Sequence, residues 1–223
     1  MSLTNALSSA ISGVQANQRQ IQLVSNNVSN ASVEGYSRKT AALETRLNGS
    51  GVDVAEVRRE VDNFLVDQAR RQQSAVGYDA TKAEFFSRIQ DFFGTPNSDS
   101  AISNTLNSLQ VAFEELAIEP ENSAAQTEVV ERAKDAARQF RTLTQQTQDL
   151  RGQADAQIEV SVREVNAALS EIRDLNAEIV TARGAGKPTG DLADARDQAL
   201  KGLSEQMDVN TIKRASGEIV VMS

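Results

Sequence analysis

Residues 3–31 repeat an apolar position every three or four residues, the heptad spacing of a helix that packs along one seam. Arg19 is the only charged side chain among residues 1–33, where Ser, Asn, Gln, Thr and Ala fill most other positions. Uncharged side chains can be buried against neighbouring molecules without stranding a charge away from water. The pattern therefore predicts an assembly helix over residues 1–35. We expect these residues to pack between subunits: Leu3, Leu7, Ala10, Val14, Ile21, Val24 and Val28, with Asn17 at the polar step.

The rest of the chain alternates between helical spacing and turn signals. Residues 36–59 predict an extended, irregular connector with a short β-like run near its end. Helical spacing then returns over residues 60–93, from 102 to 119, from 123 to about 183 and from 191 to about 207. No Pro interrupts the third of these, so about 60 residues predict a rod of roughly 90 Å. Ser100 is expected to cap the helix that starts at 102, and Ser123 to open a capping box with Gln126.

Residues 208–223 change from helical spacing to two short β-like runs around a Gly turn, which predicts a β-hairpin. Because the sequence stops inside the second run, we expect a larger β domain to continue beyond residue 223. The fold class is therefore mainly α. We predict an N-terminal assembly helix (1–35), an extended connector (36–59), an elongated antiparallel helical bundle or coiled coil (60–207), and a hairpin that opens a β domain (208–223).

Composition excludes most chemistry. The chain has neither Cys nor His, which removes thiolate nucleophiles, Ser-His and Cys-His pairs and most transition-metal sites. A net charge of -8 argues against nucleic acid as a partner. A membrane-surface helix would need basic residues on its polar face, where the N-terminal helix offers only Arg19. We therefore predict no enzyme activity, no cofactor, no metal site and no membrane or nucleic-acid partner.

Two further clusters have alternative interpretations. Asp191, Asp194 and Asp197 could suggest a cation site, but they open a helix, where the dipole favours acids. We expect them to form a capped, solvated face. Four Phe side chains within residues 85–93 could dock a partner, but their helical spacing favours a place in the bundle core.

Two motifs in the first third of the chain resemble the axial proteins of the bacterial flagellum. The first begins with Asn5-Ala6-Leu7, and its later residues form the closing loop: Asn30, Gly35, Tyr36, Ser37 and Arg38. The second resembles the members at the junction between hook and filament, and its residues are Gly51, Val52, Val54, Val57, Arg59, Asp62, Phe64, Leu65 and Gln68. A third similarity, residues 194–198 with the hairpin downstream, marks the passage of these proteins from a helical to a β domain.

The resemblance implies a structural subunit at the hook–filament junction that polymerises through its terminal helix and couples hook to filament. It implies export through the flagellar type III apparatus without signal cleavage, and hence a secreted, extracellular protein. The implied partners are further copies of itself in the flagellar axis, neighbouring hook and junction proteins, and an export chaperone that binds a C-terminal part absent from this sequence. That part would also hold the helix that pairs with residues 3–31, so we expect the apolar seam of residues 3–31 to lack its intramolecular partner.

In this family Gly35 and Tyr36 are expected to form the hinge after the assembly helix, and Asn17 to fix subunit register. Two alternatives stay open. The chain could be another axial subunit, a hook or distal rod protein, or it could be a soluble helical adaptor or export chaperone.

Overall fold

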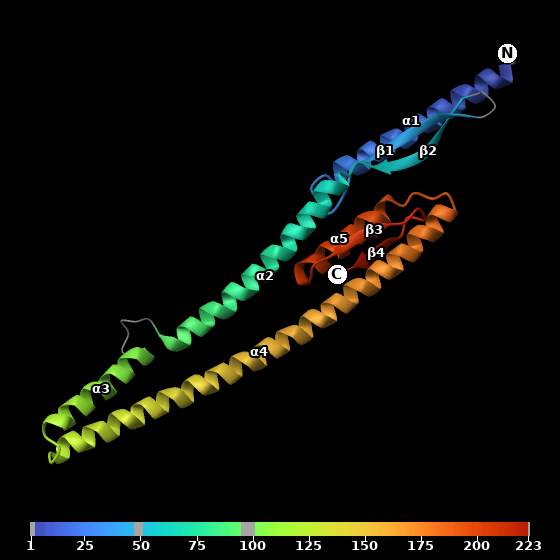
Figure 1. Cartoon of the computed structure of the whole chain (residues 1–223). Helices are drawn as coiled ribbons and strands as arrows, with labels where there is room; N and C mark the ends of the chain where they lie inside the picture. Colours follow the sequence, from blue (N-terminus) through green and yellow to red (C-terminus); the bar gives the residue numbers. More distant parts are fainter. Residues whose placement is uncertain (1–2, 47–50, 95–100, 223) are drawn as a thin grey trace. The chain divides into compact units, whose positions relative to one another are not determined.

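The computed structural model describes residues 3–46, 51–94 and 101–222, in which one antiparallel hairpin follows the first of five helices and a second follows the last (Figure 1). The helices are α1 (Leu3–Ser29), α2 (Asn63–Phe93), α3 (Ile102–Ile118), α4 (Ser123–Gly184) and α5 (Gly190–Gln206). The strands are β1 (Lys39–Thr45), β2 (Val52–Arg59), β3 (Asn210–Lys213) and β4 (Ile219–Met222). The prediction of a mainly α fold is confirmed.

The chain divides into two compact units, one of residues Met1–Gly77 with Arg163–Ser223 and the other of Tyr78–Val162. Helices α2 and α4 each pass from one unit into the other. The predicted cap at Ser100 lies outside the described residues.

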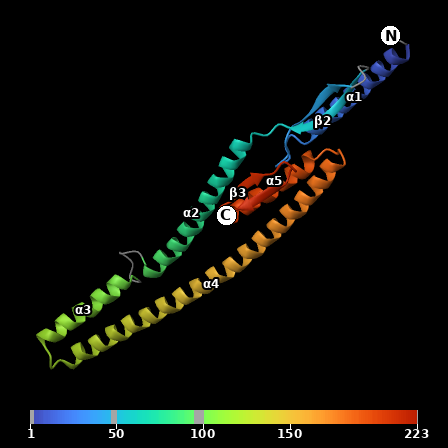
Figure 2. The same ribbon diagram turned by 45° about the vertical axis from the view of Figure 1, so that its right-hand side comes forward.

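In the first unit, α1 lies along the hairpin of β1 and β2, as Figures 1 and 2 both show. The strands pair from Lys39 opposite Arg59 to Thr45 opposite Val52, with a bulge after Ala42. The connector is extended as expected, and the β-like run predicted near its end is β2, but the prediction of irregular structure is wrong for β1. The first strand carries Ala-Ala-Leu-Glu, which has little intrinsic strand preference. Pairing with β2 and packing on α1 therefore stabilise β1 as a strand, because its own residues do not favour that conformation.

The same unit contains the main hydrophobic core. Helix α5 and the β3–β4 hairpin pack against the last turns of α4, and the buried core residues are Ile172, Leu200, Leu203 and Val209. Asn176 of α4 fixes the hairpin, because its Nδ2 donates to the Ile219 carbonyl at 2.9 Å and its Oδ1 accepts from the Ile219 N–H at 3.0 Å. The hairpin predicted within residues 208–223 is therefore present as β3 and β4.

The second unit holds the end of α2, α3 and the first part of α4, with α3 and α4 side by side in both views (Figures 1 and 2). Asn122 caps α4, since its Oδ1 accepts hydrogen bonds from the N–H groups of Ala124 and Ala125 at 2.9 and 3.3 Å. The predicted capping box is wrong, because Asn122 already occupies the cap position one residue earlier. Gln126 donates instead to the Pro120 carbonyl at 2.8 Å.

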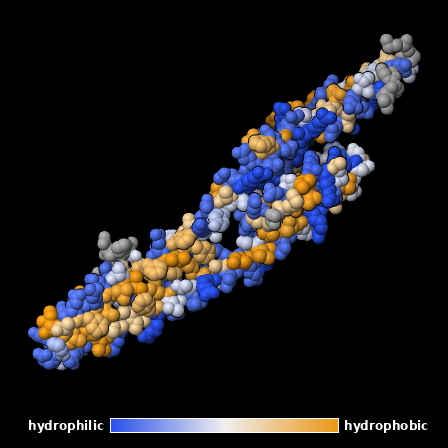
Figure 3. Space-filling model, in the orientation of Figure 1, coloured by the Kyte–Doolittle hydropathy of each residue, from blue (hydrophilic) through white to orange (hydrophobic). Residues whose placement is uncertain are grey.

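Apolar side chains also reach the surface of the second unit. Figure 3 shows them gathered over α3 and the first turns of α4, where Phe113 and Ile118 are exposed. The four Phe side chains of residues 85–93 were expected in the bundle core. Phe85 and Phe92 are half-buried, whereas Phe86 and Phe93 are exposed, so the core interpretation is wrong for the latter pair. Their helix meets its neighbours along a stripe too narrow to cover four rings.

Candidate assembly surface and the junction that anchors it

The predicted packing residues lie together on one face of α1, and that face is exposed. We call it the seam face, and it consists of Leu3, Leu7, Ala10, Val14, Asn17, Ile21, Val24 and Val28. The exposed fraction ranges from 57% for Val14 to 92% for Leu3 among its larger apolar side chains. Burying such a side chain in a partner contributes about 1.5–3 kcal/mol. Burial of the seam face would therefore be favourable.

The other side of α1 packs against the chain's own hairpin. Ser12 and Ala16 are buried there, and Leu23 and Asn27 are half-buried. At 100° per residue, this side is roughly 130° around the helix from the seam face. The hairpin thus covers the small, polar side of α1 and leaves the seam face open. Small side chains allow the close approach of the hairpin, whereas the apolar side chains stay outside.

Asn27 fixes how the hairpin sits on α1. Its Nδ2 donates to the Lys39 carbonyl at 2.8 Å, and its Oδ1 accepts from the Lys39 N–H and from the Tyr36 hydroxyl, each at 2.9 Å. Ser12 adds a second tie, because its Oγ accepts from the Val52 N–H at 3.1 Å. Sequence reasoning missed both residues. Their signal was a polar side chain repeated on the side of the helix opposite the seam.

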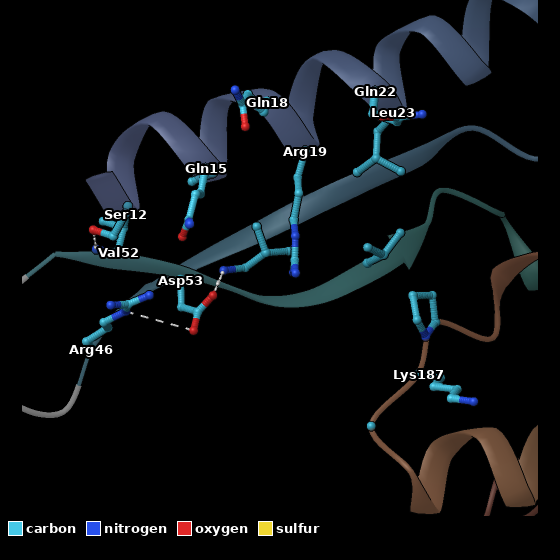
Figure 4. A pocket seen from close by; sticks show the side chains of 15 residues that line it. Ser12, Gln15, Gln18, Arg19, Gln22, Leu23, Arg46, Val52, Asp53 and Lys187 are labelled. Atoms are coloured by element: carbon cyan, nitrogen blue, oxygen red, sulfur yellow. Dashed lines mark hydrogen bonds and ion pairs between the residues drawn. The ribbon is translucent and has the colours of Figure 1, made fainter. Parts of the chain in front are cut away.

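Arg19 lies away from the seam face. It lines an open hollow of about 730 Å³ between α1, β2 and residues 186–188, together with Arg46 and Lys187. Figure 4 shows Arg19 extending from α1 toward the hairpin, where Asp53 faces Arg46 at 4.0 Å. The one charge of the N-terminal helix would therefore not be buried by packing on the seam face.

The loop after α1 runs against α5. Gly35 has a φ of +80°, and a Cβ at this position would fall 1.7 Å from Gln198 Nε2. The Tyr36 ring lies 3.8 Å beneath Lys39 Nζ, and Ser37 Oγ donates to Asp194 Oδ1 at 2.5 Å. Arg38 is exposed, and the Asn30 side chain donates to the Asn26 carbonyl at 2.9 Å. The structure thus places Gly35 and Ser37 against α5, whereas Tyr36 contacts Asn27 of α1 and Lys39 of β1.

A network of charges joins this loop and the hairpin to α5. We call it the junction network, and it consists of Ser37, Lys39, Arg59, Asp191, Asp194 and Asp197. Lys39 Nζ lies 2.8 Å from Asp191 and 2.7 Å from Asp194. Arg59 contacts Asp194 at 2.9 Å and Asp197 at 2.6 Å.

Asp194 lies at the centre of this network and is buried, with 7% of its surface exposed. The prediction of a solvated acidic face is therefore wrong for Asp194 and for the partly covered Asp197, and it holds for Asp191, whose side chain is 90% exposed. Burial lowers the pKa of Lys39, but its hydrogen bonds to Asp191 and Asp194 outweigh this and raise the pKa above its ordinary value. Lys39 therefore stays an ammonium ion beside Asp194.

The residues of the second family motif, Gly51 to Gln68, lie at several places around α1 and the junction network. Gly51 has a φ of +97° and approaches Ser12 so closely that a Cβ would fall 2.1 Å from its Oγ. Asp62 caps α2, because its Oδ1 accepts from the Phe64 and Leu65 N–H groups at 3.0 and 3.2 Å. Three further motif residues line the hollow beneath α1: Val52, Val54 and Val57. Arg59 belongs to the junction network. The side chains of Phe64, Leu65 and Gln68 are exposed.

The described residues include no group of three or more His, Cys, Asp or Glu side chains arranged to hold a metal ion. None of the helices that the structure describes has the length and apolar character needed to cross a membrane. What the site offers is an exposed apolar face on a helix that is held by polar contacts to its own hairpin, and a charged junction beneath it.

Comparison with known proteins gives two family matches. The model described as "Flagellar hook-associated protein FlgK helical domain" matches residues 86–223, and the model described as "Flagella basal body rod protein" matches residues 7–36. The similar curated proteins are named "Flagellar hook-associated protein 1". The Salmonella typhimurium protein is 30% identical over 225 residues, which cover 96% of this chain and 40% of the relative.

The Escherichia coli K12 protein of that name is 28% identical, over 96% of this chain and 41% of the relative. The Bacillus subtilis protein is 27% identical, over 95% of this chain and 44% of the relative. The chain therefore spans about two fifths of the length of these relatives.

Proposed function

The chain belongs to the family of the flagellar hook-associated protein FlgK helical domain, and from this premise we propose that it serves as a structural subunit at the hook–filament junction. The relatives are named as hook-associated proteins, and the family match covers residues 86–223. The rod-protein model matches only residues 7–36, which gives less support to a hook or distal rod subunit. No finding favours a soluble adaptor or export chaperone.

The seam face is the observation that carries this proposal. Its apolar side chains are exposed on a helix whose one charge points elsewhere, so packing in a polymer buries apolar surface and strands no charge. We propose that residues 1–35 form the assembly helix and that the seam face contacts further copies of the chain and neighbouring hook and junction proteins. Asn17, the polar step of the seam, sets the register between subunits.

The junction network gives the assembly helix a mechanical role. Lys39 and Arg59 connect the hairpin beneath α1 to α5, and α5 belongs to the main core. Load on α1 therefore reaches the core through short ion pairs around Asp194. Gly35 and Tyr36 form the turn at which α1 can change direction relative to that core. The function proposed is transmission of force between hook and filament, without catalysis.

Two further parts of the proposal concern the path to the flagellum. The protein is secreted through the flagellar type III apparatus and works outside the cell. An export chaperone is a further partner of the protein. Membership of the family and the match of residues 7–36 to a flagellar rod-protein model support both parts.

Replacement of Val14 by Asp tests the seam face directly. Val14 is 57% exposed, so Asp is tolerated in the isolated chain, but a carboxylate buried at a subunit contact without a partner would be strongly unfavourable. We expect V14D to leave the helical content of the purified chain unchanged and to remove the protein from sheared flagella. The matched control is Gln72→Asp, which adds the same charge at an exposed position of α2. Normal amounts of V14D in flagella of normal length would contradict the proposal.

A further inference from the structure

A second, smaller hollow in the first unit gathers five cations and one carboxylate among its lining residues. It has a volume of about 280 Å³ and lies among the end of β2, the last turns of α4, the start of α5 and the β3–β4 turn. We call it the basic hollow. Its charged lining residues are Arg58, Arg59, Arg183, Arg196 and Lys213, with Glu56 as the one carboxylate.

Only two of these cations have carboxylate partners. Arg58 pairs with Glu56 at 2.8 Å, and Arg59 is held by the junction network. Arg183 donates to the Ala215 carbonyl at 3.2 Å, a neutral acceptor. In the part of the chain that the structure describes, Arg183, Arg196 and Lys213 form no ion pair with a carboxylate. Among the residues that the structure describes, the basic hollow therefore carries three positive charges without a paired carboxylate.

Of the three cations, Arg196 has the largest desolvation cost, because it is buried, with 3% of its surface exposed. Its Nη1 donates to Asn176 Oδ1 and to the Gly217 carbonyl, each at 2.8 Å, and its Nε has no hydrogen-bond partner among the described residues. Burial lowers the pKa of the guanidinium; Asp197 opposes this, and Arg59 and Arg70 add to the lowering. A buried cation among other cations is stabilised by any anion that approaches it.

The start of α5 adds to the positive potential of the hollow. Thr189 and Gly190 line it, and the Thr189 side chain makes no capping hydrogen bond to the helix. Unsatisfied N–H groups and the helix dipole favour anions at such an end. This end alone would not define a site, but it lies in the same hollow as the three unneutralised cations.

We propose that the basic hollow binds an oxyanion group, supplied either by free phosphate or sulfate or by a side-chain carboxylate of a neighbouring subunit. Guanidinium groups present paired donors that match phosphate, sulfate and carboxylate oxygens. The volume suits a small anion and is below the range typical of pockets for drug-sized ligands. The subunit source rests on the proposed function, whereas the free-anion source does not.

Isothermal titration of the purified chain with inorganic phosphate tests the site without requiring assembly. In Tris chloride at constant ionic strength, we expect saturable binding to the wild-type chain. The double variant R183Q/K213Q removes two surface cations from the hollow and leaves buried Arg196 in place, so it should fold and weaken phosphate binding at least tenfold. The matched control is Arg214→Gln, because Arg214 pairs with Glu218 at 3.7 Å and does not line the hollow.

A zero-length carbodiimide cross-link in sheared flagella distinguishes the two sources. The reagent joins Lys213 Nζ to a carboxylate in contact with it, and K213R keeps the charge but cannot react. A Lys213 product that forms in flagella and not in the isolated chain assigns the site to a subunit carboxylate. Phosphate binding without that product assigns it to a free anion. Absence of both phosphate binding and the product overturns the proposal, and failure of the protein to enter flagella would leave the phosphate result standing.

Discussion

Substitution of Asp194 by Asn removes the charge at the centre of the junction network. Removing one partner from a buried ion pair costs about 3–5 kcal/mol. Here Lys39 keeps Asp191 and Arg59 keeps Asp197, and the Asn carbonyl can still accept from Ser37, so we expect a loss of about 2–3 kcal/mol. The loss should be local, because the network joins the hairpin and the loop after α1 to α5 and lies outside the second unit.

Hydrogen exchange measured by mass spectrometry is the suitable assay, because unfolding of a two-unit chain need not be two-state. At 1.36 kcal/mol per tenfold change, exchange in peptides from β1, β2 and α5 should become roughly 30- to 160-fold faster in D194N. Exchange in α3 should stay unchanged.

The control for this experiment is Asp191→Asn, which removes a carboxylate at a similar distance from Lys39 but with a side chain that is 90% exposed. An exposed pair contributes about 0–1 kcal/mol, so D191N should change exchange by less than about fivefold. Equal effects of D191N and D194N, or no effect of D194N, would refute the reasoning that burial makes Asp194 the anchor.

Three other predictions concern the first unit. Gly35→Ala should lower the free energy of unfolding by more than Gly186→Ala in chemical denaturation: both have positive φ, a conformation that costs about 1–2 kcal/mol for Ala, but only at Gly35 does the new Cβ meet Gln198. Leu200→Ala should cost about 2–5 kcal/mol by the same assay, because Leu200 is 0% exposed; a loss below about 1 kcal/mol would argue against the core described. Because the pKa of Lys39 is raised on folding, its stabilisation should be complete below about pH 10.4 and decline as the pH rises through the folded pKa. The difference in unfolding free energy between wild type and Lys39→Met should thus shrink only at alkaline pH, and a difference that shrinks on acidification from pH 9 to pH 7 would contradict this assignment.

The helices could be predicted from the sequence because their evidence is local and long. Apolar positions repeat at helical spacing over most of the chain, and Gly94, Pro96 and Pro120 mark the breaks. The β3–β4 hairpin could be predicted for the same reason, since two β-like runs flank a Gly turn. Strand β1 could not, because its residues favour a strand only when β2 and α1 are in place.

Only the part of the candidate site that lies on a single helix could be predicted from the sequence. The seam face follows from spacing along α1 alone. The junction network joins residues up to 157 positions apart, so Asp194 looks like any acid in the first turn of a helix until Ser37 and Lys39 are placed against it. Asn27 was similarly indistinguishable from the other amides of α1. Its role depends on the backbone of Lys39, which no spacing pattern reveals.

Packing of the seam face between subunits is the central claim, and the reactivity of a single cysteine tests it most directly. The chain contains no Cys, so Ile21→Cys places one thiol at a position whose side chain is 69% exposed, and Gln72→Cys provides a control. A maleimide should label both variants at similar rates in the isolated chain. In intact flagella we expect labelling of I21C to slow at least tenfold, with Q72C slowed much less. Labelling of I21C at the same rate in flagella and in the isolated chain would contradict the account.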